Sequence, residues 1–217
     1  MSDARDRMIA RAARAIEPGM LVNLGIGLPT RVVNFLPSGM EVGLHTENGL
    51  VGVGPTQDYD HADRDLIDAG GAYISALPGG AFIDSATSFA IVRSGRLNLT
   101  MLGAFEVAQN GDLANWKIPG KFSPGVGGGI ELAQKAAHVM VLTTHTDRKG
   151  NPKLLERCTL PLTAKGAVER IFTDMAVVDV TAKGFALREL AEDVSVDDVI
   201  AATGAPLIIP EGDIPTF

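Results

Sequence analysis

The sequence predicts an α/β protein with a mostly parallel open sheet flanked by helices, and three observations carry this prediction. Short apolar runs that end in glycine turns are repeatedly followed by helical patterns, which is the order found in parallel sheets covered by helices. Apolar residues make up 46% of the 217 residues and charged residues 21%, with 25 glycines, which is typical of a soluble α/β domain. Because neither a repeat nor a low-complexity linker is visible, we expect one domain over residues 1–217.

The first expected helix covers residues 4–16. Met8, Ile9 and Ala12 recur on one face of this segment, while arginines occupy the other face. Pro18 ends the pattern, since proline cannot continue a helix.

A strand over residues 20–24 leads into a turn that contains Gly25 and Gly27, and a helix is expected from about Thr30. A strand, a glycine turn and a helix in this order form the layout of a phosphate-binding turn. Crowding of the backbone at the turn explains the two glycines equally well. The third glycine of the dinucleotide fingerprint is missing, so a Rossmann-type cofactor site has little support.

Glu47 follows the apolar run 42–44 and is followed at once by Asn48 and Gly49. A strand that ends in such a turn presents the carboxylate at the edge where open α/β sheets bind their ligands. The alternative is an ordinary acidic turn residue on the surface. Hydrogen-bonding neighbours such as His45 and the apolar flanks favour a functional role.

Further strands are expected at residues 72–77 and 97–102, with a helix between them that starts at the N-cap Asp84 and stops at Gly95. Residues 103–116 are predicted to form a loop. This loop carries many polar groups, and a functional loop and a self-satisfied surface loop are equally good interpretations.

The glycine-rich segment 125–129 (GVGGG) precedes an expected helix over residues 130–137 and a strand over residues 138–143. Consecutive glycines that open a helix leave free backbone N–H groups, which can hold an oxyanion or a phosphate. The last expected elements are strands at 171–172 and 175–180 and a helix that starts at the capping box Ser195-x-x-Asp198.

The net charge of −7 argues against a nucleic-acid partner, because such proteins concentrate positive charge on one face. No apolar run is long enough to span a bilayer, and the N-terminal segment lacks the apolar core of a signal peptide. We therefore expect a cytoplasmic protein with neither a membrane nor a nucleic-acid partner.

Cys158 is the single cysteine and lies in an apolar, strand-like run, so we expect a buried structural thiol and not a nucleophile. His138 and His145 lie at the two ends of an expected strand. Neither has a second ligand at metal-site spacing, so no metal site is expected.

The segment Thr46–Pro55, TENGLVGVGP, resembles the SENGLxGxGP signature of the β subunits of class I coenzyme A transferases. This group includes succinyl-CoA:3-ketoacid and 3-oxoadipate CoA-transferases. The likeness covers most of the chain and continues, in order, through residues 22–30 (VNLGIGLPT), 101–116, 118–121 and 158–163 (CTLPLT).

This resemblance implies the CoA-transferase fold, which is similar to that of sugar-phosphate isomerases. It implies that Glu47 attacks an acyl-CoA and then carries CoA as a glutamyl thioester. It also places Asn23 and the backbone of Gly127 and Gly128 around the oxyanion. The family sequence GMGGAMD reads GVGGGIE here, which leaves open which glycine donates. The residues expected to contact CoA are Gly25, Gly27, Asn48 and Gly49.

The implied activity is that of the β subunit of a 3-oxoacid CoA-transferase, which moves CoA from succinyl-CoA to acetoacetate or 3-oxoadipate. Coenzyme A is then a co-substrate, and no other cofactor is expected. The implied partner is an α subunit in an α2β2 heterotetramer. Two other interpretations stay open: a thioester hydrolase or sugar-phosphate isomerase that uses Glu47 as a general base, and a non-catalytic sensor of a phosphorylated metabolite.

Overall fold

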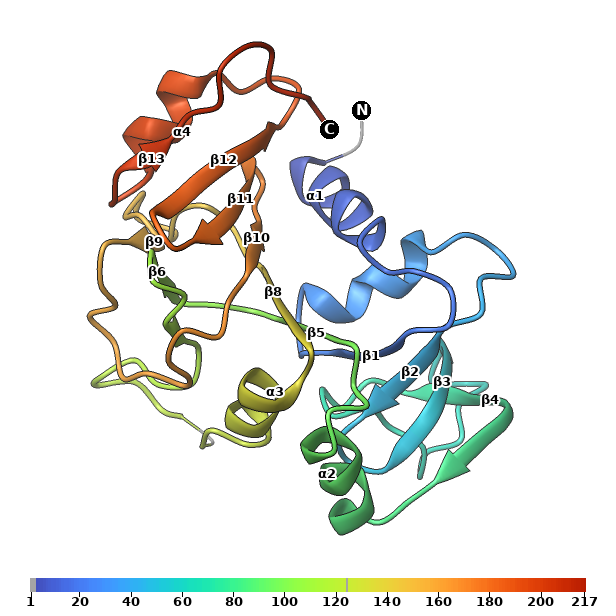
Figure 1. The fold of residues 1–217 in the computed structure, drawn as a ribbon. Helices are drawn as coiled ribbons and strands as arrows, with labels where there is room; N and C mark the ends of the chain where they lie inside the picture. Colours follow the sequence, from blue (N-terminus) through green and yellow to red (C-terminus); the bar gives the residue numbers. More distant parts are fainter. Residues whose placement is uncertain (1–2, 124) are drawn as a thin grey trace.

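A long twisted sheet runs through the protein (Figure 1). The computed structural model describes residues 3–123 and 125–217. The helices in these residues are α1 (Ala4–Ala13), the 3-10 helix η1 (Pro29–Phe35), α2 (Ser85–Arg93), α3 (Gly129–Lys135) and α4 (Val196–Ala202).

The strands are β1 (Leu21–Leu24), β2 (Gly43–Thr46), β3 (Leu50–Thr56), β4 (Ile74–Phe82), β5 (Leu99–Leu102), β6 (Glu106–Ala108), β7 (Leu113–Ala114), β8 (His138–Leu142), β9 (Leu154–Leu155), β10 (Arg170–Phe172), β11 (Ala176–Thr181), β12 (Gly184–Leu190) and β13 (Leu207–Ile208).

Within the described residues the main sheet has ten strands in the order β13-β12-β11-β10-β8-β5-β1-β2-β3-β4. The central strands β10, β8, β5, β1 and β2 are parallel to one another. Antiparallel strands extend the sheet on both sides, with β3 and β4 beyond β2 and with β11 and β12 beyond β10. The parallel centre confirms the predicted fold class.

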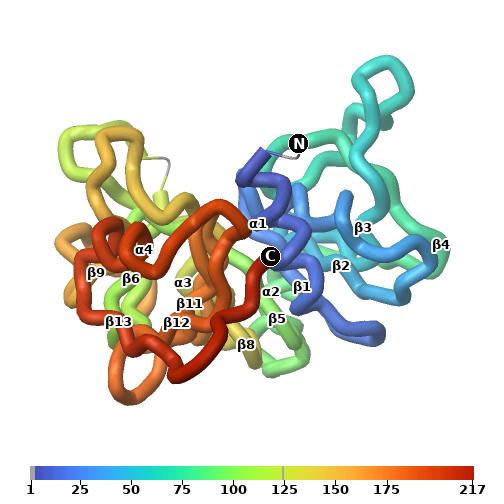
Figure 2. The backbone as a smooth tube through the Cα atoms, turned by 90° about the horizontal axis from the view of Figure 1, so that it is seen from above, coloured from blue at the N-terminus to red at the C-terminus, as the bar shows by residue number. Residues whose placement is uncertain are grey.

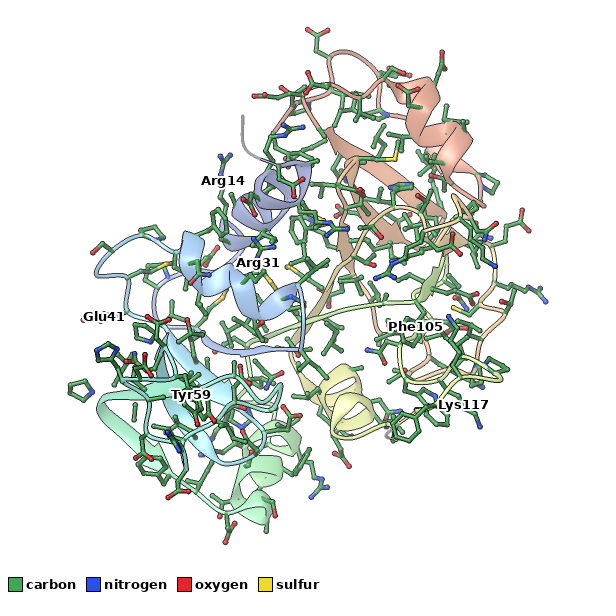
Figure 3. All side chains as sticks on the ribbon, turned by 180° about the vertical axis from the view of Figure 1, so that it is seen from behind. Arg14, Arg31, Glu41, Tyr59, Phe105 and Lys117 are labelled. Carbon is green, nitrogen blue, oxygen red and sulfur yellow. The ribbon has the colours of Figure 1, made fainter. Side chains whose placement is uncertain are left out.

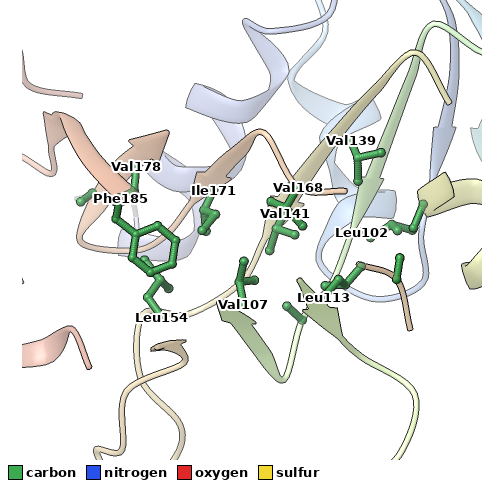
Figure 4. Packing of buried hydrophobic residues seen from close by; sticks show 14 of the residues in the cluster. Leu102, Val107, Leu113, Val139, Val141, Leu154, Val168, Ile171, Val178 and Phe185 are labelled. Atoms are coloured by element: carbon green, nitrogen blue, oxygen red, sulfur yellow. The ribbon is translucent and has the colours of Figure 1, made fainter. Parts of the chain in front are cut away.

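Two apolar cores cover the two faces of the sheet, because alternate residues of a strand point to opposite sides. Val139 and Val141 of β8 belong to the core that includes residues of α2, α3, α4 and the small sheet β7-β6-β9. Figure 4 shows these valines on the side of β8 that faces Val107 and Leu113. Leu142 belongs to the opposite core, under α1 and η1.

Helix α1 lies against the middle of the sheet, close to the C-terminus of the chain (Figure 2). Its residue Arg11 donates two hydrogen bonds to Glu189 of β12, at 2.6 and 2.5 Å. Asp6 of α1 pairs with Arg31 of η1, and Figure 3 locates Arg31 beside α1. The first helix is therefore attached both to β12 and to η1.

Local capping signals predicted two helices correctly. Asp84 accepts a hydrogen bond from the Thr87 N–H at the start of α2, and Ser195 and Asp198 form the predicted capping box of α4. The N-terminal helix is also confirmed, although it ends at Ala13, with Arg14 as its C-cap.

Other predicted elements were wrong in type or extent. The helix expected from Thr30 is the 3-10 helix η1, which has no side-chain cap and starts with a proline. The strand expected at 72–77 is the edge strand β4, which continues to Phe82. The loop expected at 103–116 contains β6 and β7. Strands β4 and β6 depend on pairing with β3 and β9, which lie elsewhere in the sequence and which local patterns do not report.

Within the described residues, no helix is both long and apolar enough to cross a membrane.

Candidate functional site

The turn Glu47–Gly49 joins β2 to β3 at one edge of the parallel sheet. Strand β2 is parallel to β1, so the turn after β1 and the turn after β2 lie at the same edge. The Glu47 side chain is half-buried, while its neighbours His45 and Thr46 are buried. The structure therefore presents one carboxylate at the carboxyl end of the central strands.

Contacts with the segments that flank this turn hold it in place. The Thr46 hydroxyl donates to Oδ1 of Asn48 over 2.6 Å, and Nδ2 of Asn48 donates to the Ile67 carbonyl over 2.9 Å. Gly49 has φ of 127°, and a Cβ at this position would collide with the carbonyl oxygen of Ile83. Asn48 and Gly49, both predicted to contact CoA, thus also fix the path of the backbone on each side of Glu47.

Gly128, at the N-terminus of α3, lies directly beside Glu47. A Cβ built on Gly128 would stand 3.4 Å from Cγ of Glu47 and 3.0 Å from the Phe89 ring. Gly127, which has φ of 55°, has no heavy atom within 4 Å of the corresponding Cβ position. The fold thus brings Gly128 to the Glu47 carboxylate from a distant part of the sequence.

Asn23 lies on β1, buried, next to His45 of β2. Its amide nitrogen donates to the His45 carbonyl over 3.1 Å and lies 3.3 Å from Nδ1 of the His45 ring. Its amide oxygen accepts from the Thr100 hydroxyl over 3.4 Å. The polar atoms of the Asn23 side chain therefore have partners within the chain.

The His45 ring continues this network to helix α2. Its Nε2 lies 2.9 Å from the hydroxyl of Ser88, which is fully buried. Burial lowers the pKa of His45 from its usual value, which favours the neutral ring. The network thus links β5, β1, β2 and α2 beneath the turn of Glu47.

Gly25 and Gly27 lie in the turn after β1, as predicted. The Gly25 N–H donates to the Met101 carbonyl over 2.8 Å, and a Cβ at Gly25 would lie 3.1 Å from that oxygen and from the Leu102 side chain. Close packing against β5 accounts for this glycine. Gly27 has φ of 92°, a backbone conformation that favours glycine, and this accounts for the second glycine of the turn.

The polar residues of segment 103–116 bind other parts of the same chain. Glu106 accepts hydrogen bonds from Thr159 and from the Leu160 N–H, and Asp112 accepts one from the Gly166 N–H over 2.9 Å. These contacts support the interpretation that the polar groups of residues 103–116 satisfy one another and the rest of the chain, and not the interpretation of a functional loop.

Cys158 lies outside any strand, so the strand-like setting expected for it was wrong. Burial, reinforced by the carboxylates of Glu106 and Asp112, raises the pKa of its thiol to about 12. The thiol stays protonated at neutral pH, as a structural cysteine should.

His138 pairs with Glu169, and the buried His145 binds the hydroxyls of Thr173 and Thr203. In residues 3–123 and 125–217, no cluster of three or more His, Cys, Asp or Glu side chains has the geometry for holding a metal ion.

Two depressions lie near these elements. One, of about 580 Å³, lies between the end of α3 and residues 162–167; the other, of about 70 Å³, lies between β1, β2, β3 and residues 68–74. Glu47 lines neither of them.

Two residues that contribute to the site escaped the sequence reasoning, Ser88 and Phe89 of α2. Ser88 is fully buried and lies four positions before the buried Val92, so its place on the same helical face was the available sequence signal. Polar residues on the inner face of a helix require a partner, and here the partner is His45.

Comparisons with known proteins agree with these motifs. The profile of the Coenzyme A transferase family matches residues 5–202. A probable coenzyme A transferase subunit beta of Bacillus subtilis is 47% identical over 205 residues, which are 94% of both chains. The human mitochondrial succinyl-CoA:3-ketoacid coenzyme A transferase 2 is 47% identical over 209 residues, which are 95% of this chain and 40% of the human protein.

Solved structures agree on the fold. An acyl-CoA transferase of Escherichia coli O157:H7, YdiF, superposes over 100% of this chain and 43% of its own length, with a TM-score of 0.79 and 20% sequence identity. Such a low identity supports the fold alone, whereas the family profile covers most of the chain. The protein therefore belongs to the coenzyme A transferase family.

Proposed function

We propose that this protein is the β subunit of a 3-oxoacid CoA-transferase, which moves CoA from succinyl-CoA to a 3-oxo acid such as acetoacetate or 3-oxoadipate. The observation that carries the proposal is Glu47, held at the carboxyl edge of the sheet directly beside the backbone of Gly128. The human relative, named for succinyl-CoA and a 3-ketoacid, supports the choice of substrates. No observation favours the hydrolase, isomerase or sensor interpretations.

A carboxylate in this position suits nucleophilic catalysis on a thioester. Glu47 attacks the acyl carbon of the donor, CoA leaves as a thiolate, and a mixed anhydride remains. The thiolate then attacks the Glu47 carbonyl of the anhydride and releases the donor acid as its carboxylate. The glutamyl-CoA thioester that results passes CoA to the second acid by the same two steps in reverse.

Each of these steps forms a tetrahedral oxyanion, which needs a hydrogen-bond donor at the position where the charge develops. Gly128 supports this role because its backbone lies against Glu47 and carries no side chain that would fill the space. Asn23 supports the site indirectly, because its hydrogen bonds connect β1 to β2, the strand that leads into Glu47. We assign the oxyanion contact to Gly128, with Gly127 shaping the loop that leads to it.

A second subunit completes the proposed enzyme. The Bacillus relative is named as a subunit beta, and this chain spans only 40% of the human relative. We propose an α subunit as the partner, in an α2β2 assembly that acts in the cytoplasm with CoA as co-substrate and no further cofactor.

The test is to trap the intermediate. The chain is co-expressed with a CoA-transferase α subunit, and the purified complex is treated with succinyl-CoA in the absence of an acceptor acid. The peptide that contains Glu47 should gain the mass of CoA less one water. The isolated chain should show little turnover. An enzyme that turns over while Glu47 stays unmodified would refute the covalent route, because a general base leaves no adduct.

A further inference from the structure

Helix α2 contacts both β2, the strand that leads into Glu47, and Gly128. On one side, Ser88 of α2 meets the His45 ring of β2, with 2.9 Å between Oγ and Nε2. On the other side, the next residue, Phe89, packs its ring against Gly128. Because Glu47 follows His45 by two residues, the contacts form a closed loop from β2 to α2, to Gly128 and back to Glu47.

The hydrogen-bond pattern fixes the tautomer of His45. The Asn23 amide nitrogen must face the His45 carbonyl, because a carbonyl only accepts, and this orientation places N–H groups towards Nδ1 of the ring. Nδ1 is therefore the acceptor, and Nε2 carries the proton that it donates to Ser88. All of these groups are buried, so water does not compete for the bond.

Contacts between α2 and α3 are close, and α3 begins at Gly129. The two helices lie side by side in Figure 1, and Arg93 of α2 donates to Glu131 of α3 at 3.0 and 3.1 Å. Two carbon atoms of the Phe89 ring, Cζ and Cε1, would stand 3.0 and 3.1 Å from a Cβ on Gly128. This close packing leaves little room for the glycine to move towards α2. A displacement of α2 relative to β2 would therefore displace Gly128 relative to Glu47.

We propose that His45 and Ser88 are positioning residues, whose hydrogen bond fixes α2 against β2 and so sets the separation between the Glu47 carboxylate and the backbone of Gly128. Neither side chain touches the reacting atoms. The kinetic consequence of the inference rests on the proposed function, because it concerns the attack of Glu47 on a thioester. The structural consequence, that α2 couples β2 to Gly128, does not depend on that function.

Four variants separate the effect of the His45–Ser88 hydrogen bond from the effect of side-chain size. Ser88→Ala removes the hydroxyl. His45→Asn keeps an acceptor at the Nδ1 position, but its side chain is too short to bond Ser88. His45→Gln places an amide N–H near the Nε2 position, so it keeps a donor for Ser88. Ser94→Ala is the matched control, since it removes a hydroxyl at the other end of α2 that binds only the Ile91 carbonyl.

The kinetic measurement is the rate at which Glu47 gains its CoA adduct from succinyl-CoA in the two-subunit enzyme. Ser88→Ala and His45→Asn should each lower this rate by about tenfold, with little change in KM, because fractions of an ångström matter for positioned groups. The double variant should be no slower than either single variant, since both remove the same bond. His45→Gln should recover most of the rate, and Ser94→Ala should behave as wild type.

Hydrogen exchange of the peptide covering residues 125–135 gives a readout that needs no catalysis. Exchange should be faster in Ser88→Ala than in wild type and unchanged in Ser94→Ala. A lowered melting temperature with a normal adduct rate, multiplicative effects in the double variant, or unchanged exchange would each overturn the inference. If the wild-type enzyme forms no adduct, the proposed function fails, and the exchange measurement still decides whether α2 couples β2 to Gly128.

Discussion

Gly128 and Glu47 lie against each other although they belong to different elements, with a Cβ on Gly128 only 3.4 Å from Cγ of Glu47. The Phe89 ring closes the other side of this glycine at 3.0 Å. A side chain at position 128 would therefore press on the Phe89 ring and would touch Cγ of Glu47.

Gly128→Ala should slow CoA-adduct formation on Glu47 by about tenfold or more, since overpacking of about 1–3 kcal/mol here acts on the reacting pair. The control is Gly129→Ala, whose Cβ meets its neighbours at ordinary distances of 3.6 and 3.9 Å. This neighbouring variant should keep the wild-type rate. Equal rates for both variants would show that the space beside Gly128 has no catalytic importance.

Glu47→Gln and Glu47→Asp should both fold and should both be severely impaired. Glutamine removes most of the nucleophilicity, while aspartate withdraws the carboxylate by about 1 Å, which costs roughly 100-fold in a positioned reaction. Steady-state rates of the two-subunit enzyme, together with thermal unfolding, provide the test. An aspartate variant with wild-type turnover would contradict the nucleophilic role.

Asn23→Ala should lower both turnover and stability. Its amide serves His45 and Thr100 inside the protein, so truncation leaves buried partners unpaired at a cost of about 1–3 kcal/mol. If the amide also acts on the reaction, turnover per folded molecule should fall by a further 10²- to 10³-fold, roughly the effect of losing an oxyanion donor. Thr100→Val is the control, because it removes one partner of Asn23 and leaves the Asn23 amide in place. A loss of stability alone would assign Asn23 a purely structural role.

Stability should fall between about pH 6.5 and pH 4 because of His145. Burial lowers the pKa of this histidine from 6.5 to about 4 in the folded protein, although nearby Asp174 opposes the effect. The unfolded chain therefore binds the proton more readily, so the histidine favours the folded state above pH 6.5 and progressively less as the pH falls through about 4. The difference corresponds to about 3 kcal/mol of free energy of unfolding.

Denaturant unfolding at several pH values measures this dependence. The slope of stability against pH should be smaller in His145→Gln than in wild type over this range. His138→Gln, which changes an exposed histidine, is the control and should keep the wild-type slope. A slope that is the same in both variants would assign the acid sensitivity to other groups, such as His45.

Cys158 should react slowly with iodoacetamide at pH 8, because a thiol with a pKa of about 12 is almost entirely protonated there. Mass spectrometry after timed alkylation, with unfolded protein as the reference, measures the protection. The variant Cys158→Ala should retain turnover. Rapid alkylation of the folded enzyme would show that the thiol is more accessible than its surroundings indicate.

Local sequence was sufficient for features that form within one or two turns of the chain. The N-caps of α2 and α4 were predicted correctly because a cap involves residues three positions apart. The alternation of strands, glycine turns and helices indicated the parallel centre of the sheet, and the motif around Glu47 identified the family. Strand β12 was not predicted, and it lies outside the parallel centre, where it pairs antiparallel with β11 and parallel with the two-residue strand β13.

The sequence by itself determined the class of fold and the family, and it predicted Glu47 as the reactive carboxylate. Only the tertiary structure decided what surrounds that carboxylate. His45 and Ser88 are 43 residues apart, and their partnership depends on α2 packing over the end of β2. The same helix places Phe89 against Gly128, and Gly128 lies beside Glu47. These contacts are set by side-chain packing between elements, which no periodicity or capping signal within one segment encodes.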